Sequence, residues 1–500
     1  LGPGNICALL SEFIGLFRAG RHDGRHVEIV TKVIRVKLLI NRVGSFGMTG
    51  KTFLCGVFLL FALVGTGFCQ LVSLDECIEI ALQNNSTLRN AARREQVAGT
   101  QVTDAWSAFL PTISTSLSAG KSIRGARVDQ ENVPVGYDSL TNRTLFDQQQ
   151  ITQPRSERNS HSASISLNQN LWDFGRSSNG IRQSKALQSA SRFSREQTEL
   201  DVVLQVKVAY YELLKQLHLQ EVYGKAVALA QQQLDEAQTR LDIGLASQAE
   251  VYAARVNLGS NRAALLEQQN LVEFGRADLN YAMGRDPSTP IEVTEDRSAP
   301  IFPDQDIKQA VDTAIAGNKT IKMLELEARS NLFAYQAAKA RYMPALGFGA
   351  SYSRANDDYN RVYTSNLDED YSVNLGLSFQ LNLFNGFTDK AAIQRQQLGY
   401  EIALEDLTEA RRIVIANVKQ YFLRLAAYRD LLEINRENIE AAEENLRLQR
   451  EKRRVGSGTE LEVAQAQVQL TEAHSSYVRA EYDAKIARAR LESVLGISSR

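Results

Sequence analysis

The stretch RLDIGLASQAEV (residues 240–251) interrupts a long helix-forming segment with Gly244, and Ser247 follows three residues later. Far along the chain, RRVGSGTELEV (residues 453–463) makes nearly the same interruption. Glycine readily adopts the left-handed backbone conformation that ends a helix. A Ser or Thr followed by Glu three residues on is the capping box that starts the next helix. Both stretches therefore predict a tight turn between two antiparallel helices.

The two turns correspond at an offset of 212 residues, which aligns Gly244 with Gly456 and Glu250 with Glu462. We expect each turn to be the far end of a helical hairpin. Its residues are small and uncharged, which suits a flat surface that docks a partner. The predicted docking residues are Gly244, Leu245, Ala246 and Ser247 in the first turn and Gly456, Ser457, Gly458 and Thr459 in the second.

The turns belong to a longer internal repeat. Residues 81–114 align without gaps on residues 314–347 at an offset of 233, and from Asn170 onward the offset is 212. This fall from 233 to 212 means that the first half carries 21 extra residues between Ser118 and Asn170. The period is far too long for a solenoid repeat. The sequence therefore indicates the duplication of a whole structural unit.

Prolines separate the two halves. None lies between Pro154 and Pro287 or after Pro344, so long helices are permitted there, whereas four cluster between residues 287 and 303. The domains that we expect are a first repeat of two strands and a helical hairpin at 71–286, a proline-rich linker at 287–304, and a second such repeat at 305–500.

The N-terminal region has the pattern of an export signal. Residues 48–70 contain Lys51, then an apolar run from Phe53 to Val64, then small residues. This is typical of a secretory signal peptide and is short for a transmembrane helix. Residues 1–47 lack a targeting pattern, so we expect them to be a non-native extension upstream of a true start at Met48. The bulky Phe68 argues against lipidation of Cys69.

Strict alternation of apolar and polar residues predicts four strands, at 112–119, 162–171, 346–352 and 371–383. One face of each strand is apolar, and the other is polar but uncharged. This pattern suits a transmembrane barrel with a wet lumen, although a soluble, half-buried sheet shares it. The residues between the first two strands, about 120–161, are rich in Gln, Asn, Ser and Arg and are predicted to form a surface loop.

The remaining segments predict unusually long helices. Nothing interrupts a helix from about Ser177 to Asp242, which at 1.5 Å per residue would reach roughly 95 Å. Apolar residues at a 3,4 spacing predict antiparallel coiled-coil packing on both sides of the turns. They are Val227, Ala230, Leu234, Ala237 and Leu241 before the first turn, and Val463, Ala466, Leu470, Ala473, Tyr477, Ala480, Ala484, Ala487 and Leu491 after the second.

Composition argues against several function classes. The chain has 57 basic and 58 acidic residues and no block of like charge, so no nucleic-acid partner is expected. Three of its four cysteines fall in the first 70 residues, and no two of its five histidines have ligand spacing on a plausible body segment, so neither a disulfide framework nor a metal site is expected. No Ser/His/Asp arrangement or paired-carboxylate site supports an enzyme, and no cofactor is expected.

The duplicated strand–helix unit, the junctions LWDFG (171–175) and LFNGF (383–387), and the turns IGLAS and VGSGT together resemble the TolC family of outer-membrane efflux proteins. The resemblance covers about residues 71–497. It implies a mixed α+β membrane protein that forms a homotrimer. Four strands per chain would form a shared twelve-stranded transmembrane β-barrel, continuous with a long periplasmic α-helical barrel of antiparallel coiled-coil hairpins. Independently, four strands are too few to close a barrel, so their edges would pair between chains.

The resemblance also implies a function and partners. The protein would be a passive channel-tunnel of a tripartite efflux pump or type I secretion system in the outer membrane of a Gram-negative bacterium, embedded in outer-membrane lipid. Its tips would meet a periplasmic adaptor, which connects it to an inner-membrane pump of the RND or ABC type. Glu462 matches an acidic pore constriction of the family, whereas Gln465 stands where a second acid can occur. The alternative is a secreted or periplasmic coiled-coil scaffold protein.

Overall fold

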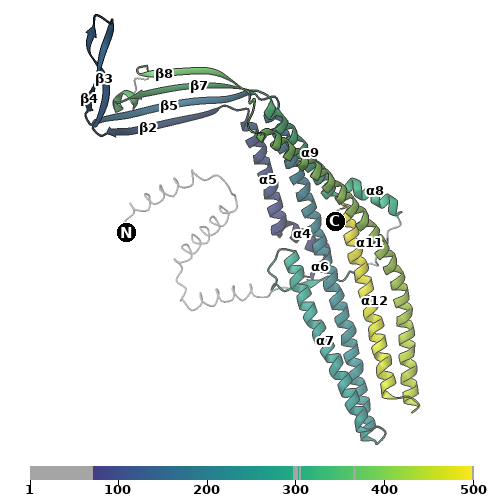
Figure 1. Cartoon of the computed structure of the whole chain (residues 1–500). Coiled ribbons are helices and arrows are strands. Elements are labelled where there is room, and N and C mark those ends of the chain that lie inside the picture. Colours follow the sequence, from purple (N-terminus) through teal and green to yellow (C-terminus); the bar gives the residue numbers. More distant parts are fainter. Residues whose placement is uncertain (1–70, 297–301, 303–305, 364–367, 498–500) are drawn as a thin grey trace, which may run out of the picture. The chain divides into compact units, whose positions relative to one another are not determined.

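The computed structural model describes residues 71–296, 302, 306–363 and 368–497 (Figure 1). The predicted signal peptide, the segment before it, Cys69, and Pro300 and Pro303 of the predicted linker lie outside the described residues.

The two halves of the chain contain equivalent elements in the same order, except between their two sheet strands, where the first half has β3 and β4 and the second has α10. The first half comprises β1 (Leu71–Val72), α4 (Leu74–Asn84), α5 (Ser86–Ser107), β2 (Thr112–Arg124), β3 (Arg127–Asp138), β4 (Arg143–Gln153), β5 (Ser156–Trp172), α6 (Arg176–Asp242) and α7 (Gln248–Ala282). The second comprises β6 (Glu292–Val293), α8 (Ile307–Gly317), α9 (Lys319–Lys339), a 3-10 turn (Ala340–Tyr342), β7 (Ala345–Asn356), α10 (Tyr359–Tyr363), β8 (Tyr371–Gln380), α11 (Thr388–Arg454) and α12 (Glu460–Val494).

The lengths of the helices follow the repeat. Helices α6 and α11 each have 67 residues, and α7 and α12 each have 35. The predicted uninterrupted helix from Ser177 to Asp242 is therefore confirmed by α6. The element bounds in the two halves also agree with the offsets of 233 and 212 in the sequence.

Strands β2, β5, β7 and β8 form one antiparallel sheet in that order (Figure 1). All four predicted strands are thus present, although β8 ends at Gln380 rather than at Leu383. Side chains directly opposite one another share a face, so Ile113, Leu167, Ala350 and Leu375 form one apolar row. The next row, on the other face, is entirely polar.

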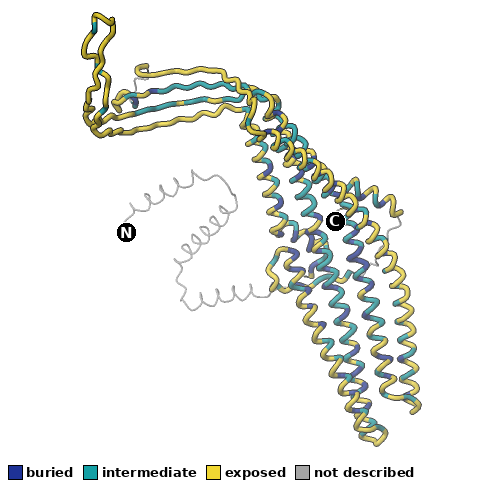
Figure 2. Tube along the Cα trace, in the orientation of Figure 1, coloured by how far each residue is buried: buried dark blue, intermediate teal, exposed yellow. Residues whose placement is uncertain are grey.

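The prediction of a loop at about 120–161 is wrong. Strand β2 continues to Arg124, β5 begins at Ser156, and β3 and β4 pair between them as a separate two-stranded sheet. The hairpin is exposed on both faces, as Figure 2 shows. Since neither face is buried, no alternation of apolar and polar residues marks these strands in the sequence.

The long helices form two hairpins that lie side by side. Helix α6 packs on α7, α11 packs on α12, and α6 also packs on α12, so the order across the helices is α7, α6, α12, α11 (Figure 1). The predicted stripes lie inside the hairpins. Near the first turn Ala237 packs with Val251 and Ala254, and near the second Leu446 packs with Val463 and Ala466.

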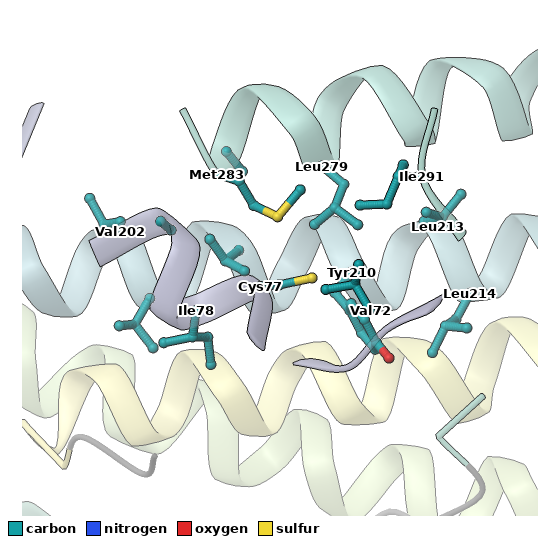
Figure 3. Close-up of a cluster of buried hydrophobic side chains, with 14 of the residues drawn as sticks. Val72, Cys77, Ile78, Val202, Tyr210, Leu213, Leu214, Leu279, Met283 and Ile291 are labelled. Atoms are coloured by element: carbon teal, nitrogen blue, oxygen red, sulfur yellow. The ribbon is translucent and has the colours of Figure 1, made fainter. Parts of the chain in front are cut away.

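A larger hydrophobic core lies where the short helix α4 and strands β1 and β6 meet α6 and α7 (Figure 3). Tyr210 is at its centre, and its hydroxyl donates a 2.6 Å hydrogen bond to the carbonyl of Thr294. Burial raises the pKa of the nearby Cys77 thiol to about 12, so this cysteine is an inert core residue. The core thus ties the segment after α7 to the long helices.

A buried asparagine at equivalent positions of the two halves anchors the short helices to the long ones. Asn85 caps α5 and donates from Nδ2 to a carbonyl at the end of α7, and Asn318 caps α9 and donates to a carbonyl at the end of α12, both at 3.2 Å. Gly284 and Gly496, both at φ +71°, lie against these caps, where a Cβ would approach the facing backbone oxygen to 2.9 and 2.7 Å. Only glycine fits there.

Candidate functional site: the hairpin tips and the sheet

The first tip has the predicted turn geometry. Gly244 has φ +77°, and its N–H donates to the carbonyl of Leu241 at 2.9 Å, while the next N–H donates to the carbonyl of Arg240 at 2.7 Å. These bonds satisfy carbonyls that the end of α6 would otherwise leave unpaired. Ser247 and Glu250 then form a complete capping box at the start of α7.

The second tip repeats this arrangement with one glycine more. Gly456 has φ +82°, and the N–H groups of Ser457 and Gly458 both donate to the carbonyl of Lys452, at 2.9 and 3.1 Å. A Cβ at Gly458 would approach Lys452 and the following backbone nitrogen to 3.0 Å, whereas one at Gly456 would meet open space. Thr459 completes a capping box with Glu462.

The tips also carry apolar side chains that the sequence analysis missed. Ile243 and Val455 occupy equivalent positions just before the two glycines, and both are about two-thirds exposed, as is Leu245. The signal was available in the alignment, because a β-branched residue precedes the glycine in both turns. Each tip is therefore a small turn flanked by exposed apolar side chains rather than a uniformly small surface.

Behind the second tip, charged side chains connect the two hairpins. Arg453 of α11 pairs with Glu460 of α12, with 2.6 Å between Nη2 and Oε2, and its Nη1 lies 3.5 Å from Oε2 of Glu236 in α6. Arg453 and Glu460 are buried, whereas Glu236 is half exposed. We call these three residues the tip ion cluster. It could not be found from sequence, since it joins residues more than 200 positions apart.

The predicted pore residues Glu462 and Gln465 both lie exposed in the first turns of α12. The Glu462 carboxylate accepts hydrogen bonds from the backbone N–H of Thr459 at 2.7 Å and from its hydroxyl at 3.0 Å. These bonds lower the pKa of Glu462 below its usual value, the backbone bond contributing most. Glu462 is thus held ionised at the N-terminus of a helix, and Gln465 is one turn further along.

The polar face of the sheet is lined by hydroxyl, amide and glycine groups. Three successive rungs between β2 and β5 are serine pairs, with Oγ–Oγ distances of 2.7 to 2.8 Å. From Thr112 to Ser118, and along the residues of β5, β7 and β8 aligned with this stretch, no residue on this face is charged, whereas further along β5 Arg158 lies on it opposite Ser122. On the opposite face, Leu375, Leu377 and Phe379 of β8 are each about 70% exposed.

Each strand-to-helix junction is built from two consecutive left-handed residues, Phe174 and Gly175 in the first half and Gly386 and Phe387 in the second. The aromatic and glycine positions are exchanged, but the backbone conformation is the same. Exposed aromatic side chains lie at both junctions. The ring centroids of Trp172 and Phe174 are 6.0 Å apart, and those of Phe384 and Phe387 are 5.4 Å apart.

Among the described residues, no group of His, Cys, Asp or Glu side chains is placed to hold a metal ion. No described helix combines the length and the apolar character needed to cross a membrane.

Comparison with known proteins gives consistent matches. A family model described as "Outer membrane efflux protein" matches residues 77–285 and 310–497. The outer membrane efflux protein BepC of Brucella suis biovar 1 is 23% identical over 394 residues, covering 78% of this chain and 84% of BepC. The outer membrane protein TolC of Vibrio cholerae serotype O1 is 23% identical over 431 residues, covering 85% of this chain and 91% of that TolC. The crystal structure of the outer membrane protein VceC from Vibrio cholerae has a TM-score of 0.68 at 17% identity, covering 85% of this chain and 97% of VceC, which shows likeness of fold.

Proposed function

The chain belongs to the outer membrane efflux protein family, and from this premise we propose that three copies form a passive export duct through the outer membrane and into the periplasm. Each copy contributes four strands to a twelve-stranded barrel and two helical hairpins to the tunnel below it. The protein carries out no chemistry of its own, and an inner-membrane pump of the RND or ABC type supplies the energy.

The observation that carries this proposal is the sheet. Its edge strands β2 and β8 have no further strand partner among the described residues, and its polar face lies opposite a strongly exposed apolar face. Unpaired edges cannot remain in a lipid bilayer, where no water satisfies their backbone groups. Pairing β8 of one copy with β2 of the next removes both edges at once. The apolar face then meets lipid, and the serine-lined face surrounds the duct.

The helices support the same assembly. Helix α7 exposes Tyr252, Val256, Phe274 and Tyr281, and α11 exposes a similar set that includes Leu423. These two helices are the outermost of the four in each copy. Association of α7 with α11 of a neighbour would bury both surfaces, since exposed apolar surface of this extent favours contact between proteins.

The junction aromatics mark the expected membrane boundary. Transmembrane β-barrels carry girdles of aromatic residues at both interfaces between lipid and water. Trp172 and Phe174 in one half and Phe384 and Phe387 in the other lie where the strands meet the helices. We therefore place the periplasmic edge of the bilayer at this level, with the hairpins below it.

The tips are proposed to dock a periplasmic adaptor. Residues 244–247 and 456–459 present two equivalent turns, of which the first includes exposed Leu245, and exposed Ile243 and Val455 precede them. The hairpins of an adaptor could pack on these small turns and cover the apolar side chains. Glu462, and with it Gln465, is proposed to face the pore at its periplasmic entrance. Residues 48–70 are proposed to direct export, and 71–286, 287–304 and 305–500 to be the first repeat, the linker and the second repeat.

Native mass spectrometry of the detergent-extracted outer-membrane protein tests the assembly, with a complex of three chains expected. A stable, folded monomer would overturn the proposal, because a lone copy would leave its strand edges unpaired. Single-channel recording in planar bilayers then tests the duct. A coiled-coil scaffold, the alternative, would be extracted without detergent and would conduct no current. Proteins that co-purify with the trimer identify the adaptor and pump.

A further inference from the structure

The β3–β4 hairpin is a direct continuation of β2 and β5. Strand β2 ends at Arg124 and β3 begins at Arg127, and the hairpin is paired from Arg127 opposite Gln153 to Asp138 opposite Arg143. Figure 1 shows it beyond the end of the sheet, and its side chains are mostly exposed. The hairpin therefore leaves the sheet at the ends of β2, an edge strand, and β5, and Figure 1 shows it turned away from the direction of these two strands.

The register of the hairpin sorts its side chains by charge. Residues directly opposite one another share a face, and every paired position on one face is uncharged. At its middle are two pairs of amides, Gln130 with Gln150 and Asn132 with Gln148, and Phe146 follows opposite Pro134. The other face carries all the charged residues of the two strands, two arginines and four acids, which are Arg127, Asp129, Glu131, Asp138, Arg143 and Asp147.

We propose that the uncharged face is a contact surface on which the hairpins of neighbouring copies meet outside the barrel. The inference rests on the proposed trimer, in which β2 adjoins the next copy. Because β3 continues β2, the hairpin rises at the seam between two copies, and the threefold symmetry brings three identical hairpins to the same mouth. A second copy of this chain is therefore the partner that the position supplies.

Charge decides which face makes the contact. The charged face has a net charge of −2, from two arginines and four acids, so two copies meeting through it would repel. The uncharged face can be buried without removing any ion from water. Its exposed amides, such as Gln148, can donate and accept hydrogen bonds with the same amides of a neighbour. The exposed rings of Tyr137 and Phe146 add apolar area.

The low stability expected of an isolated two-stranded hairpin also favours contact between the hairpins of neighbouring copies. A lone two-stranded hairpin is marginally stable in water, and three or more strands or packing against another element are usually needed. Within the described part of one copy, β3 and β4 pair only with each other. Contact between hairpins of three copies provides the missing packing, and it forms a collar or cap of protein around the outer end of the duct.

Cysteine cross-linking in the intact outer membrane tests this surface with a matched pair of positions. Gln148 and Gln149 are adjacent, exposed and chemically identical, but Gln148 lies on the uncharged face and Gln149 on the charged one. Under mild oxidation, Gln148→Cys should give a disulfide-linked dimer of the chain on a non-reducing gel, and Gln149→Cys should give at least five-fold less. The unmodified chain measures the background from its own cysteines.

A second measurement uses charge. Gln148→Lys in all three copies places like charges in the contact, so it should lower the temperature at which the trimer dissociates, whereas Gln149→Lys adds its charge among acidic residues and should not. Equal effects at the two positions, equal cross-linking, or a Gln148 adduct with a different protein would each overturn the proposal. Absence of a trimer by native mass spectrometry would instead count against the proposed function. An intact trimer without the Gln148 cross-link would refute this inference alone.

Discussion

Arg453 and Glu460 form a buried ion pair across the second tip, with 2.6 Å between Nη2 and Oε2. Only one turn separates them in sequence, yet Arg453 also reaches Glu236 of the other hairpin at 3.5 Å. Burial raises the pKa of Glu460 despite the attraction of Arg453, which lowers it, and Glu236 and Glu250 raise it further. A single arginine therefore holds two carboxylates together behind the tip.

This arrangement predicts a stabilising effect of mild acid on the tips. Because the pKa of Glu460 is higher in the folded state than in the unfolded state, the folded state binds its proton more tightly. The stability that this group contributes is present below its ordinary pKa of 4.5 and is lost as the pH rises through the raised folded value. Glu460→Gln should therefore reduce the decline in trimer heat stability as the pH rises above 4.5.

Heat dissociation of the trimer at several pH values measures this effect. Glu462→Gln is the matched control, because the pKa of Glu462 is lowered rather than raised. The stability that the Glu462 carboxylate contributes is present above the ordinary carboxyl pKa and is lost as the pH falls through the lowered folded value. Glu462→Gln should therefore change the dependence of trimer heat stability on pH in the opposite direction to Glu460→Gln. An unchanged pH profile in the Glu460→Gln protein would contradict the assignment.

Replacing Arg453, the arginine of the tip ion cluster, should lower the stability of the protein markedly. Arg453→Met leaves the buried carboxylate of Glu460 without its partner, and breaking such a pair costs about 3 kcal/mol or more. Arg454→Met is the control, since Arg454 is exposed and pairs with the exposed Glu451, so its loss should cost under about 1 kcal/mol. Heat dissociation of each variant gives the comparison. The double change Arg453→Met with Glu460→Met should recover much of the loss, and a purely additive result would show that the pair is not coupled.

The sequence predicted the elements that have a periodic signal and missed those that do not. The α12 stripe from Val463 to Leu491 and the alternation in β8 each reflect one apolar side, buried in α12 and exposed in β8, so their period is visible in the sequence. The β3–β4 hairpin has no buried face, so its polar residues lack alternation and predict a loop. The tip ion cluster depends on the packing of α6 against α12, which no local pattern encodes. The capping boxes at Ser247 and Thr459 were predictable because they are local.

The hairpin should be dispensable for assembly. Arg124 and Ser156 are the last residues paired between β2 and β5, so residues 125–155 can be replaced by Asn-Gly, which favours a two-residue hairpin turn. The sheet retains its order, and outer-membrane trimer levels should stay near normal, measured by immunoblot of unheated samples. Lower heat stability with normal assembly would agree with contact between the hairpins. Failure of the trimer to assemble would show that this segment is needed for folding.

Glu462→Gln should change ion conduction while leaving the tip folded. Glutamine can replace glutamate in a capping box, so the start of α12 is retained while one negative charge per copy is removed. If the side chain faces the pore entrance, single-channel conductance or cation preference should fall in planar bilayers. Glu250→Gln, at the equivalent position of the first tip, is the control for a general effect of charge. Identical conductance in the Glu462 variant and the wild type would place this residue away from the pore.

The docking proposal is tested most directly at Gly456. Its φ of +82° lies in the left-handed region, and a Cβ there would meet no neighbouring atom, so a substitution affects backbone conformation rather than packing. A β-branched residue at this φ costs about 1–2 kcal/mol, which is too little to unfold hairpins of this length. Gly456→Val should therefore leave trimer levels near normal while the turn shifts and export falls.

Gly456→Asn is the matched control, since asparagine tolerates this conformation and should retain more export. Trimer abundance, co-purified adaptor and efflux are measured together in the same cells. If export falls only in proportion to trimer abundance in both variants, the turn is structural and the tip does not dock a partner.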